Sequence, residues 1–259
     1  MLIPIVSKDN KTLKLIRSLK MKKGRLESGL YFAEGVRITE EALAWAEDAV
    51  YAWIASDAFA EKNKNFIQRL DETQKTVYTA RENLFREICN TDAPQGVGVV
   101  LKMPENPMIS WQEKKFVLIL DGVSEPGNLG TIIRTAEAAG VDAVILMKGC
   151  ADLFNPKVVR STMGSLFRVP CILGASTETV KELKANGFSV VATALQDSVP
   201  IGEWKASDKR ALVIGSEAFG VSDDVLALSD SRVYIPMEGH VESLNAGVAA
   251  GISMYLLKP

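Results

Sequence analysis

Short apolar runs alternate along the chain with segments whose apolar residues recur at helical spacing. In the first hundred residues this predicts strands at 30–33, 50–55 and 97–101 and helices at 39–46 and 84–88. A basic helix is predicted from 11 to 25, because Leu13, Ile16 and Leu19 share one face. The pattern therefore predicts a small α/β domain in the N-terminal part.

Beyond residue 110 the alternation becomes regular. Unbroken apolar runs predict strands at 116–120, 143–147, 189–194, 211–214 and 232–235, with helices at 129–139 and 177–185. Short apolar strands separated by helices are typical of a parallel sheet that is covered on both faces. The stretch 103–110 has two prolines and no periodicity, as expected of a linker. We therefore predict two α/β domains, 1–105 and 111–259, joined by a linker at 106–110.

Length and composition agree with two globular domains. The chain of 259 residues is longer than one ordinary domain, and 47% hydrophobic residues supply enough apolar material for real cores. No apolar stretch reaches the roughly 20 residues of a membrane span. The N-terminus turns charged after six residues and offers no signal-peptide core. We expect a soluble, cytoplasmic protein.

Net charge and the few cysteine and histidine residues limit the kinds of site that the sequence can form. The whole chain has a net charge of −2, yet its first 30 residues contain eight basic and two acidic side chains, a local net of +6. Three well-separated cysteines form no CxxC pair and suggest neither disulfides nor a thiolate metal site. The single histidine, His240, argues against a His-dependent triad, and we expect it to face solvent.

Ligands of parallel α/β sheets bind past the carboxyl ends of the strands, so the loops at those ends are the candidate sites. No GxGxxG follows a strand and no GxxxxGK[ST] occurs, which excludes the common dinucleotide and P-loop phosphate cradles. The loops that follow Leu120, Ala194, Ile214 and Ile235 are the ones that carry unusual residues.

The first of these loops leads into the helix 129–139, which Gly140 is expected to end. Asn128 is placed to cap the start of this helix. Arg134 points roughly 100° or more away from the centre of the apolar face, and therefore faces something other than the core of its own domain. A solvated Arg134 that pairs with Glu137 is the alternative.

Two later loops also carry polar residues at strand ends. Gly215 permits close backbone approach and Glu217 supplies a carboxylate, although an ordinary turn would also explain them. Ser243 and Asn245 come just before a helix of very small residues, where either could be only an N-cap.

Three segments, NLGTIIRTAEAAG, LVIGSEAFGVS and IPMEGHVESLNAGVAAGI, together resemble in order and spacing the three motifs of the SpoU/TrmH family of RNA 2′-O-ribose methyltransferases. The segment KVVRSTMGSLFRVP is similar to the stretch that the family has between motifs. The N-terminal segments LKLIRSLKMKKGR, FAEGVRITEEAL and DAPQGVGVVL resemble the ribosomal-protein-like RNA-binding domain of several rRNA-modifying members. The resemblance spans both predicted domains.

This resemblance implies a SPOUT fold with a C-terminal trefoil knot, a connectivity that periodicity does not reveal. It also implies S-adenosylmethionine as cofactor and a homodimer, which we expect around the helix 245–256 because Gly247, Ala250 and Gly251 permit close helix approach. The departures from the family pattern are Ser216, Ala218 and the pair Ala246-Gly247. The residues expected to hold the cofactor are Ala194, Leu195, Gly215, Ile235, Met237 and Leu244.

Similarity to the family gives Arg134 the lead catalytic role, acting across the dimer on the ribose 2′-hydroxyl. A guanidinium has no acceptor atom, so we expect it to hold the adjacent phosphate and to lower the pKa of the hydroxyl. Asn128, Ser243 and Asn245 would orient ribose and phosphate, Glu217 is a candidate proton acceptor, and no metal is expected.

The separate N-terminal domain favours ribosomal RNA as the substrate, and we expect 23S rRNA. Lys20, Lys22, Lys23 and Arg25 are expected to contact its phosphates, with a solvated surface helix as the alternative. A tRNA 2′-O-methyltransferase and an inactive RNA-binding homologue remain as other functions. The joint presence of Asn128, Arg134, Glu217, Ser243 and Asn245 argues against the inactive homologue.

Overall fold

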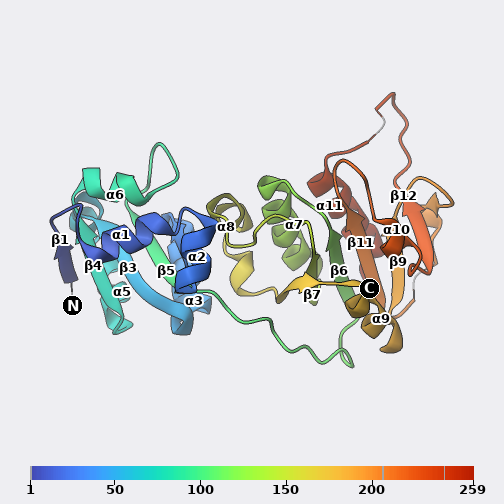
Figure 1. The fold of residues 1–259 in the computed structure, drawn as a ribbon, viewed down its shortest axis with the longest axis horizontal. Coiled ribbons are helices and arrows are strands. Elements are labelled where there is room, and N and C mark those ends of the chain that lie inside the picture. Colours follow the sequence, from blue (N-terminus) through green and yellow to red (C-terminus); the bar gives the residue numbers. More distant parts are fainter. Residues whose placement is uncertain (1, 206, 242) are drawn as a thin grey trace. The chain divides into compact units, whose positions relative to one another are not determined.

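The computed structural model describes residues 2–205, 207–241 and 243–259, and the chain divides into two compact units. Unit 1 contains the residues up to Glu105 together with Phe154–Phe167, and unit 2 contains Asn106–Leu153 and Arg168–Pro259 (Figure 1). In the part of the chain that the structure describes, no helix has the length and apolar character needed to cross a membrane.

Unit 1 is built around a five-stranded sheet with the order β1-β4-β3-β5-β2. Strand β5 is antiparallel to both of its neighbours, whereas β4 is parallel to β1 and β3. The predicted strands and short helices of this unit are confirmed. Its elements are β1 (Leu2–Ile5), α1 (Lys11–Ser18), α2 (Lys22–Ser28), β2 (Leu30–Glu34), α3 (Val36–Trp45), η1 (Glu47–Ala49), β3 (Val50–Ser56), α4 (Asp57–Lys62), α5 (Lys64–Glu72), β4 (Thr76–Ala80), α6 (Glu82–Ile88), β5 (Val97–Lys102), α8 (Pro156–Thr162) and η2 (Ser165–Phe167).

The basic segment forms two helices, so the prediction of one helix from 11 to 25 is wrong. Asn10 caps α1, because its side chain accepts hydrogen bonds from the first turn. The chain then turns before α2, and the buried Arg25 donates to the carbonyls of Leu19 at 2.7 Å and Lys20 at 3.0 Å. A Cβ on Gly24 would lie 2.3 Å from the carbonyl oxygen of Ser18. The glycine therefore permits α2 to pack closely against the end of α1.

The segment Phe154–Phe167 belongs to unit 1 although it lies between two strands of unit 2 in the sequence. The ring of Phe154 packs 4.9 Å from the ring of Tyr31, and Nη1 of Arg160 lies 3.5 Å from a carboxylate oxygen of Glu34. Val158 and Val159 on α8 are buried. The segment thus completes the apolar packing over β2.

Unit 2 has a seven-stranded sheet with the order β10-β12-β9-β11-β6-β7-β8, and every recorded pairing within it is parallel. The predicted parallel α/β sheet is therefore confirmed. Its elements are β6 (Phe116–Asp121), α7 (Pro126–Ala139), β7 (Ala143–Met147), β8 (Cys171–Ala175), α9 (Thr177–Ala185), β9 (Ser189–Thr193), β10 (Val199–Pro200), η3 (Ile201–Glu203), β11 (Arg210–Gly215), α10 (Asp223–Leu226), β12 (Ser231–Tyr234) and α11 (Ala246–Leu257).

Helices cover both faces of this sheet. Val117 and Ile119 of β6 share a buried cluster with Leu183 of α9 and Val225 of α10. The alternate residues of a strand point to the opposite face, where α11 packs against α7 and β11. Figure 1 shows α7 and α11 on one side of the sheet and α9 and α10 on the other. The site is expected beyond the carboxyl ends of the strands, where ligands of such sheets bind.

Candidate active site at the carboxyl edge of the unit 2 sheet

The residues proposed for the cofactor meet at one edge of the sheet. Strands β12, β9, β11 and β6 are neighbours in that order and run parallel, so their carboxyl ends lie side by side. Ala194 and Leu195 follow β9, Gly215 ends β11, Ile235 and Met237 follow β12, and Leu244 lies just before α11. The backbone N–H of Ala194 donates to the carbonyl of Val233 at 3.0 Å, which ties the β9 and β12 ends together.

The loop after β11 is a tight turn that folds back on Gly215. The backbone N–H of Ser216 donates to Gly220 at 2.9 Å, and the N–H of Gly220 donates back at 3.0 Å. A Cβ on Gly215 would lie 2.0 Å from the carbonyl carbon of Gly220 and 2.1 Å from the nitrogen of Val221. The local geometry is therefore that of an ordinary turn, as the alternative interpretation expects. Position 215 requires glycine because the backbone of Gly220 and Val221 passes so close to it.

Three loops that are distant in sequence are joined by one chain of hydrogen bonds. Nδ2 of Asn245 donates to Oδ1 of Asn128 at 2.9 Å, and Nδ2 of Asn128 donates to Glu217 at 2.8 Å. The Glu217 carboxylate also accepts the backbone N–H groups of Ser124 at 3.2 Å and Glu125 at 3.3 Å. Three of the five proposed catalytic residues thus form one connected network.

The same donors set the protonation of Glu217. Burial raises the pKa of its carboxyl, but the hydrogen bonds from Asn128 and from the backbone of this region outweigh that effect and hold the pKa below its ordinary value. Glu217 is therefore ionised at neutral pH and is a weaker base than an ordinary glutamate. Its environment suits positioning of the first loop better than acceptance of a proton.

The N-cap of α7 differs from the prediction, whereas the N-cap of α11 is one of the two residues that the sequence offered. Helix α7 begins at Pro126, and its N-cap is Glu125, whose side chain accepts the N–H of Asn128 at 2.6 Å. The assignment of Asn128 as the N-cap is therefore wrong, and its side chain is free to join the network instead. Asn245 does cap α11, because its Oδ1 accepts the N–H groups of Gly247 and Val248. The exposed Ser243 lies in the same loop.

Arg134 lies exposed on α7, away from the buried face of the helix. The alternative partner Glu137 is bound by Arg168, with Nη2 3.1 Å from Oε2. Among the described residues, no ion pair of Arg134 is found. The guanidinium is thus available to an external anion.

The small residues of α11 pack within the chain. A Cβ on Gly247 would lie 3.4 Å from Cγ2 of Thr131, and one on Gly251 would lie 3.5 Å from Cγ2 of Thr135, both on α7. Ala250 is fully buried. Close approach of α11 to α7 therefore explains these residues, and they no longer serve as an argument for a subunit interface.

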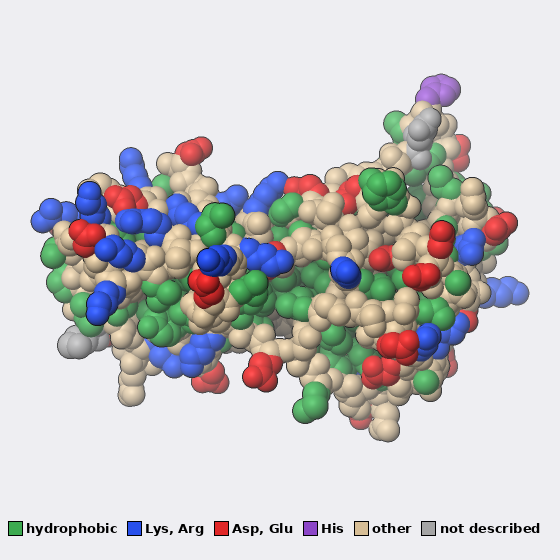
Figure 2. Space-filling model, viewed as in Figure 1, with side chains coloured by type: hydrophobic (Ala, Val, Ile, Leu, Met, Phe, Trp, Pro, Cys, Tyr) green, Lys and Arg blue, Asp and Glu red, His purple; other side chains and the backbone are tan. Residues whose placement is uncertain are grey.

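The four proposed RNA contacts differ in their surroundings. Lys22 and Lys23 are exposed on α2, and Figure 2 shows Lys and Arg side chains gathered over the face of unit 1 that carries α1 and α2. Nζ of the half-buried Lys20 donates to the carbonyl of Cys89 at 2.6 Å. Arg25 is only 3% exposed. Lys20 and Arg25 thus hold unit 1 together. Lys22 and Lys23 remain accessible to a ligand, although Nζ of Lys23 lies 3.7 Å from a carboxylate oxygen of the exposed Glu27.

Sequence reasoning overlooked two acidic residues, Asp121 at the end of β6 and Glu125 in the loop that follows it. Oδ2 of Asp121 accepts the N–H of Ser222 at 2.8 Å, which fixes the end of β6 to the segment after the β11 turn. A carboxylate directly after an apolar strand, and a proline at the first helical position, were the signals that could have found them. Within the described ranges, no group of three or more metal-ligating side chains occurs.

Comparisons with known proteins agree with this architecture. Residues 115–255 match the SpoU rRNA Methylase family, and residues 10–98 match the MRM3-like substrate binding domain. The fold and the site thus define an RNA methyltransferase. The chain belongs to the SpoU rRNA methylase family.

Relatives match over the full length. The 23S rRNA (guanosine(2553)-2′-O)-methyltransferase RlmP of Bacillus subtilis is 38% identical over 98% of both chains. The crystal structure of an AdoMet-bound rRNA methyltransferase from Sinorhizobium meliloti has a TM-score of 0.87 and 30% identity, and covers 98% of this chain and 97% of that one. The SpoU methyltransferase AviRb from Streptomyces viridochromogenes, in complex with AdoMet, has a TM-score of 0.81 and 28% identity, and covers 95% and 96%.

Proposed function

We propose that this chain transfers a methyl group from S-adenosylmethionine to the 2′-hydroxyl of one nucleotide of 23S rRNA. The observation that carries the proposal is the network from Asn245 through Asn128 to Glu217, which joins the three motif loops at the sheet edge where ligands of such folds bind. Similarity to RlmP over 98% of both chains supports the substrate. Action in the bacterial cytoplasm, where rRNA is made, is part of the proposal.

The carboxyl edge of the sheet fits the proposed cofactor. The tight turn after β11 supplies backbone at this edge, and Leu195 and Met237, which follow β9 and β12, add exposed apolar surface. Backbone and apolar contacts of this kind suit an adenosine with an uncharged base. Ala194, Leu195, Gly215, Ile235, Met237 and Leu244 would hold the cofactor, which supplies an activated methyl group when bound. We also propose that the chain is knotted at this edge.

The residues of this chain would position the ribose. Arg134 would grip the phosphate next to the attacked 2′-hydroxyl and favour loss of its proton by electrostatic attraction. Asn128, Ser243 and Asn245 would orient ribose and phosphate. Because the pKa of Glu217 is lowered, we assign this residue to positioning and the proton to a phosphate oxygen or water.

In this proposal, RNA binding and methyl transfer belong to different domains. Residues 1–105 would bind the RNA substrate, 106–110 would link the parts, and 111–259 would bind the cofactor and carry out the transfer. The match of 10–98 to a substrate binding domain supports this division.

The proposed function is tested with ribosomal RNA from cells that lack the gene for this chain. Incubation with the protein and labelled S-adenosylmethionine should add about one methyl group per 23S molecule, and mass spectrometry of nuclease fragments should place it on one ribose. Total tRNA from the same cells is the second substrate. If only tRNA is methylated, the substrate is tRNA and not 23S rRNA. If neither RNA is labelled, the proposed activity is refuted.

We propose a homodimer that brings Arg134 of one subunit to the cofactor edge of its partner. The support is an exposed apolar stripe on α11, formed by Val248, Tyr255 and Leu256 with the half-buried Ile252, because a helix face of this kind is usually covered. Light scattering at micromolar concentration should give about twice 28.2 kDa. Leu256→Asp should shift the protein to monomers and Leu26→Asp, an exposed leucine of unit 1, should not. A wild-type monomer would contradict the interface.

We expect Lys22→Glu/Lys23→Glu to weaken RNA binding and to reduce its salt dependence, since each lost phosphate contact removes released counterions. About tenfold weaker binding at 0.1 M salt is expected, measured by filter binding with 23S rRNA. The affinity for S-adenosylmethionine should not change. Lys181→Glu, an exposed lysine of unit 2, is the matched control. Unaltered RNA affinity in the double variant would place recognition elsewhere.

A further inference from the structure

Phe219 is 93% exposed, the highest value of any aromatic side chain in the described part of the chain. Phenylalanine stabilises a fold through burial of its ring, and at this exposure it contributes almost nothing of that kind. Single exposed apolar residues are common on protein surfaces. Whether Phe219 is a candidate binding residue therefore depends on where the ring lies and on how firmly its backbone is held.

The backbone that presents the ring is held firmly. The N–H of Phe219 donates to Oγ of Ser216 at 3.0 Å, and the reciprocal hydrogen bonds between Ser216 and Gly220 close the turn around it. Gly215 packs directly beneath, in contact with Gly220 and Val221. The ring is therefore carried on a preorganised turn, so a ligand would meet it without first ordering a loop.

The turn also lies at the candidate active site. Glu217, two residues before Phe219, accepts a hydrogen bond from Asn128, which in turn binds Asn245. Two residues of chain span at most about 7 Å. Leu195, at the end of the neighbouring strand β9, is 79% exposed. The backbone of Phe219 thus lies within about 7 Å of Glu217, whose carboxylate is bound to Asn128, one of the groups that we propose to orient the ribose.

We propose that the ring of Phe219 stacks on the base of the nucleotide whose ribose is methylated; this inference rests on the proposed function. Proteins recognise splayed-out RNA bases by stacking them on aromatic side chains, and every base offers a π-face for such a contact. A base can accept this ring only when it is unstacked from its RNA neighbours. The substrate is therefore an unpaired nucleotide in a loop or bulge, and Phe219 positions it without selecting its identity.

The test uses a short RNA that contains the methylated nucleotide mapped as described above. Phe219→Ala and Phe219→Leu should lower the single-turnover kcat/KM about tenfold or more, as expected for loss of one base–aromatic stack, whereas Phe219→Tyr should retain activity. Leucine is the decisive variant, because it keeps an apolar side chain and removes the π-face. The affinity for S-adenosylmethionine, the Tm and the oligomeric state should not change.

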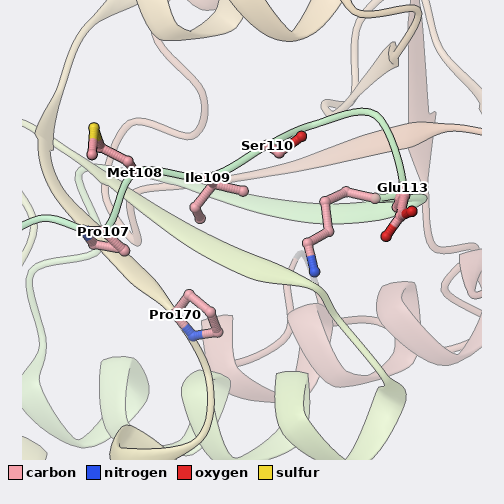
Figure 3. Close-up of a pocket in the computed structure, with 7 residues that line it drawn as sticks. Pro107, Met108, Ile109, Ser110, Glu113 and Pro170 are labelled. Atoms are coloured by element: carbon pink, nitrogen blue, oxygen red, sulfur yellow. The ribbon is translucent and has the colours of Figure 1, made fainter.

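Met108→Ala is the matched control. Met108 is fully exposed in the same unit. It stands at the rim of a pocket at the other edge of the sheet, where Lys114 and Pro170 come just before β6 and β8 (Figure 3). The pocket is lined by Pro107, Met108, Ile109, Ser110, Glu113, Lys114 and Pro170. This variant should methylate the RNA at the wild-type rate.

An RNA with an abasic site at the methylated position identifies the stacking partner. The wild type and Phe219→Ala should methylate this RNA at the same rate, because the contact that separates them is gone. Equal rates on the intact RNA, a difference that persists on the abasic RNA, weaker cofactor binding by the same factor, or a changed oligomeric state would each overturn the stacking proposal. Failure of the wild type to methylate any rRNA would instead refute the proposed function.

Discussion

Replacing Arg134 with alanine is expected to lower the rate of methyl transfer by about 10²-fold or more while S-adenosylmethionine still binds, as for loss of an electrostatic contact in a transition state. The side chain is exposed and lies off the buried face of α7, so its removal leaves no core cavity and the Tm should stay unchanged. Single-turnover methylation and calorimetric titration with the cofactor measure the two effects separately.

Arg134→Lys should restore little of the activity. An ammonium group keeps the charge but lacks the planar fork that holds a phosphate at two points. Arg168→Ala is the control within the same unit, because Arg168 is bound to Glu137 inside the chain and has no proposed contact with RNA. Near wild-type methylation by Arg134→Ala would make Arg134 a solvated surface residue and refute the proposed mechanism.

Mixed dimers distinguish action within a subunit from action across the interface. Met237→Glu alters a proposed cofactor contact at the surface, and we expect it to be inactive as well. A mixture of Arg134→Ala and Met237→Glu subunits should regain part of the activity if each Arg134 serves the partner's cofactor, because one complete site then forms per mixed dimer. No recovery after subunit exchange would place Arg134 at the site of its own chain.

Local patterns predicted the strands and helices of unit 2 well. The strand at 143–147 and the helix at 177–185 agree with β7 and α9 at both ends, because apolar runs and helical periodicity report directly on burial. The edge strand β8 was missed. It is only partly buried and contains Gly174 in a left-handed conformation, and therefore lacks the unbroken apolar run on which the prediction depends.

Contacts between distant segments could not be predicted in this way. The hydrogen bonds that Asn128 donates to Glu217 and that Asn245 donates to Asn128 span 89 and 117 residues, and neither helix nor strand periodicity contains such information. The resemblance to a family brought these residues together as a list of candidates, and the structure adds that they form one network. The position of Phe154–Phe167 in unit 1 also required three-dimensional information, since its sequence neighbours belong to unit 2.

Gly215→Ala is expected to abolish detectable binding of S-adenosylmethionine and to lower the Tm. The added methyl carbon would lie 2.0 Å from the carbonyl carbon of Gly220 and 2.1 Å from the nitrogen of Val221. Both are backbone atoms, so the overlap can be relieved only by opening the turn. Overpacking of this kind costs about 1–3 kcal/mol, which corresponds to a decrease of roughly 2–12 °C in the Tm of a chain of this size.

The consequence extends beyond the turn itself, because the turn carries Glu217 and thereby its hydrogen bond to Asn128. An opened turn should release the start of α7 and the proposed cofactor edge together, so activity should fall further than stability. Gly202→Ala is the matched control, since a Cβ at Gly202, in η3 of the same unit, meets no atom within 4 Å. Differential scanning fluorimetry and calorimetric titration of both variants provide the comparison. If Gly215→Ala binds the cofactor like the wild type and keeps its Tm, the close packing of this turn does not govern the site.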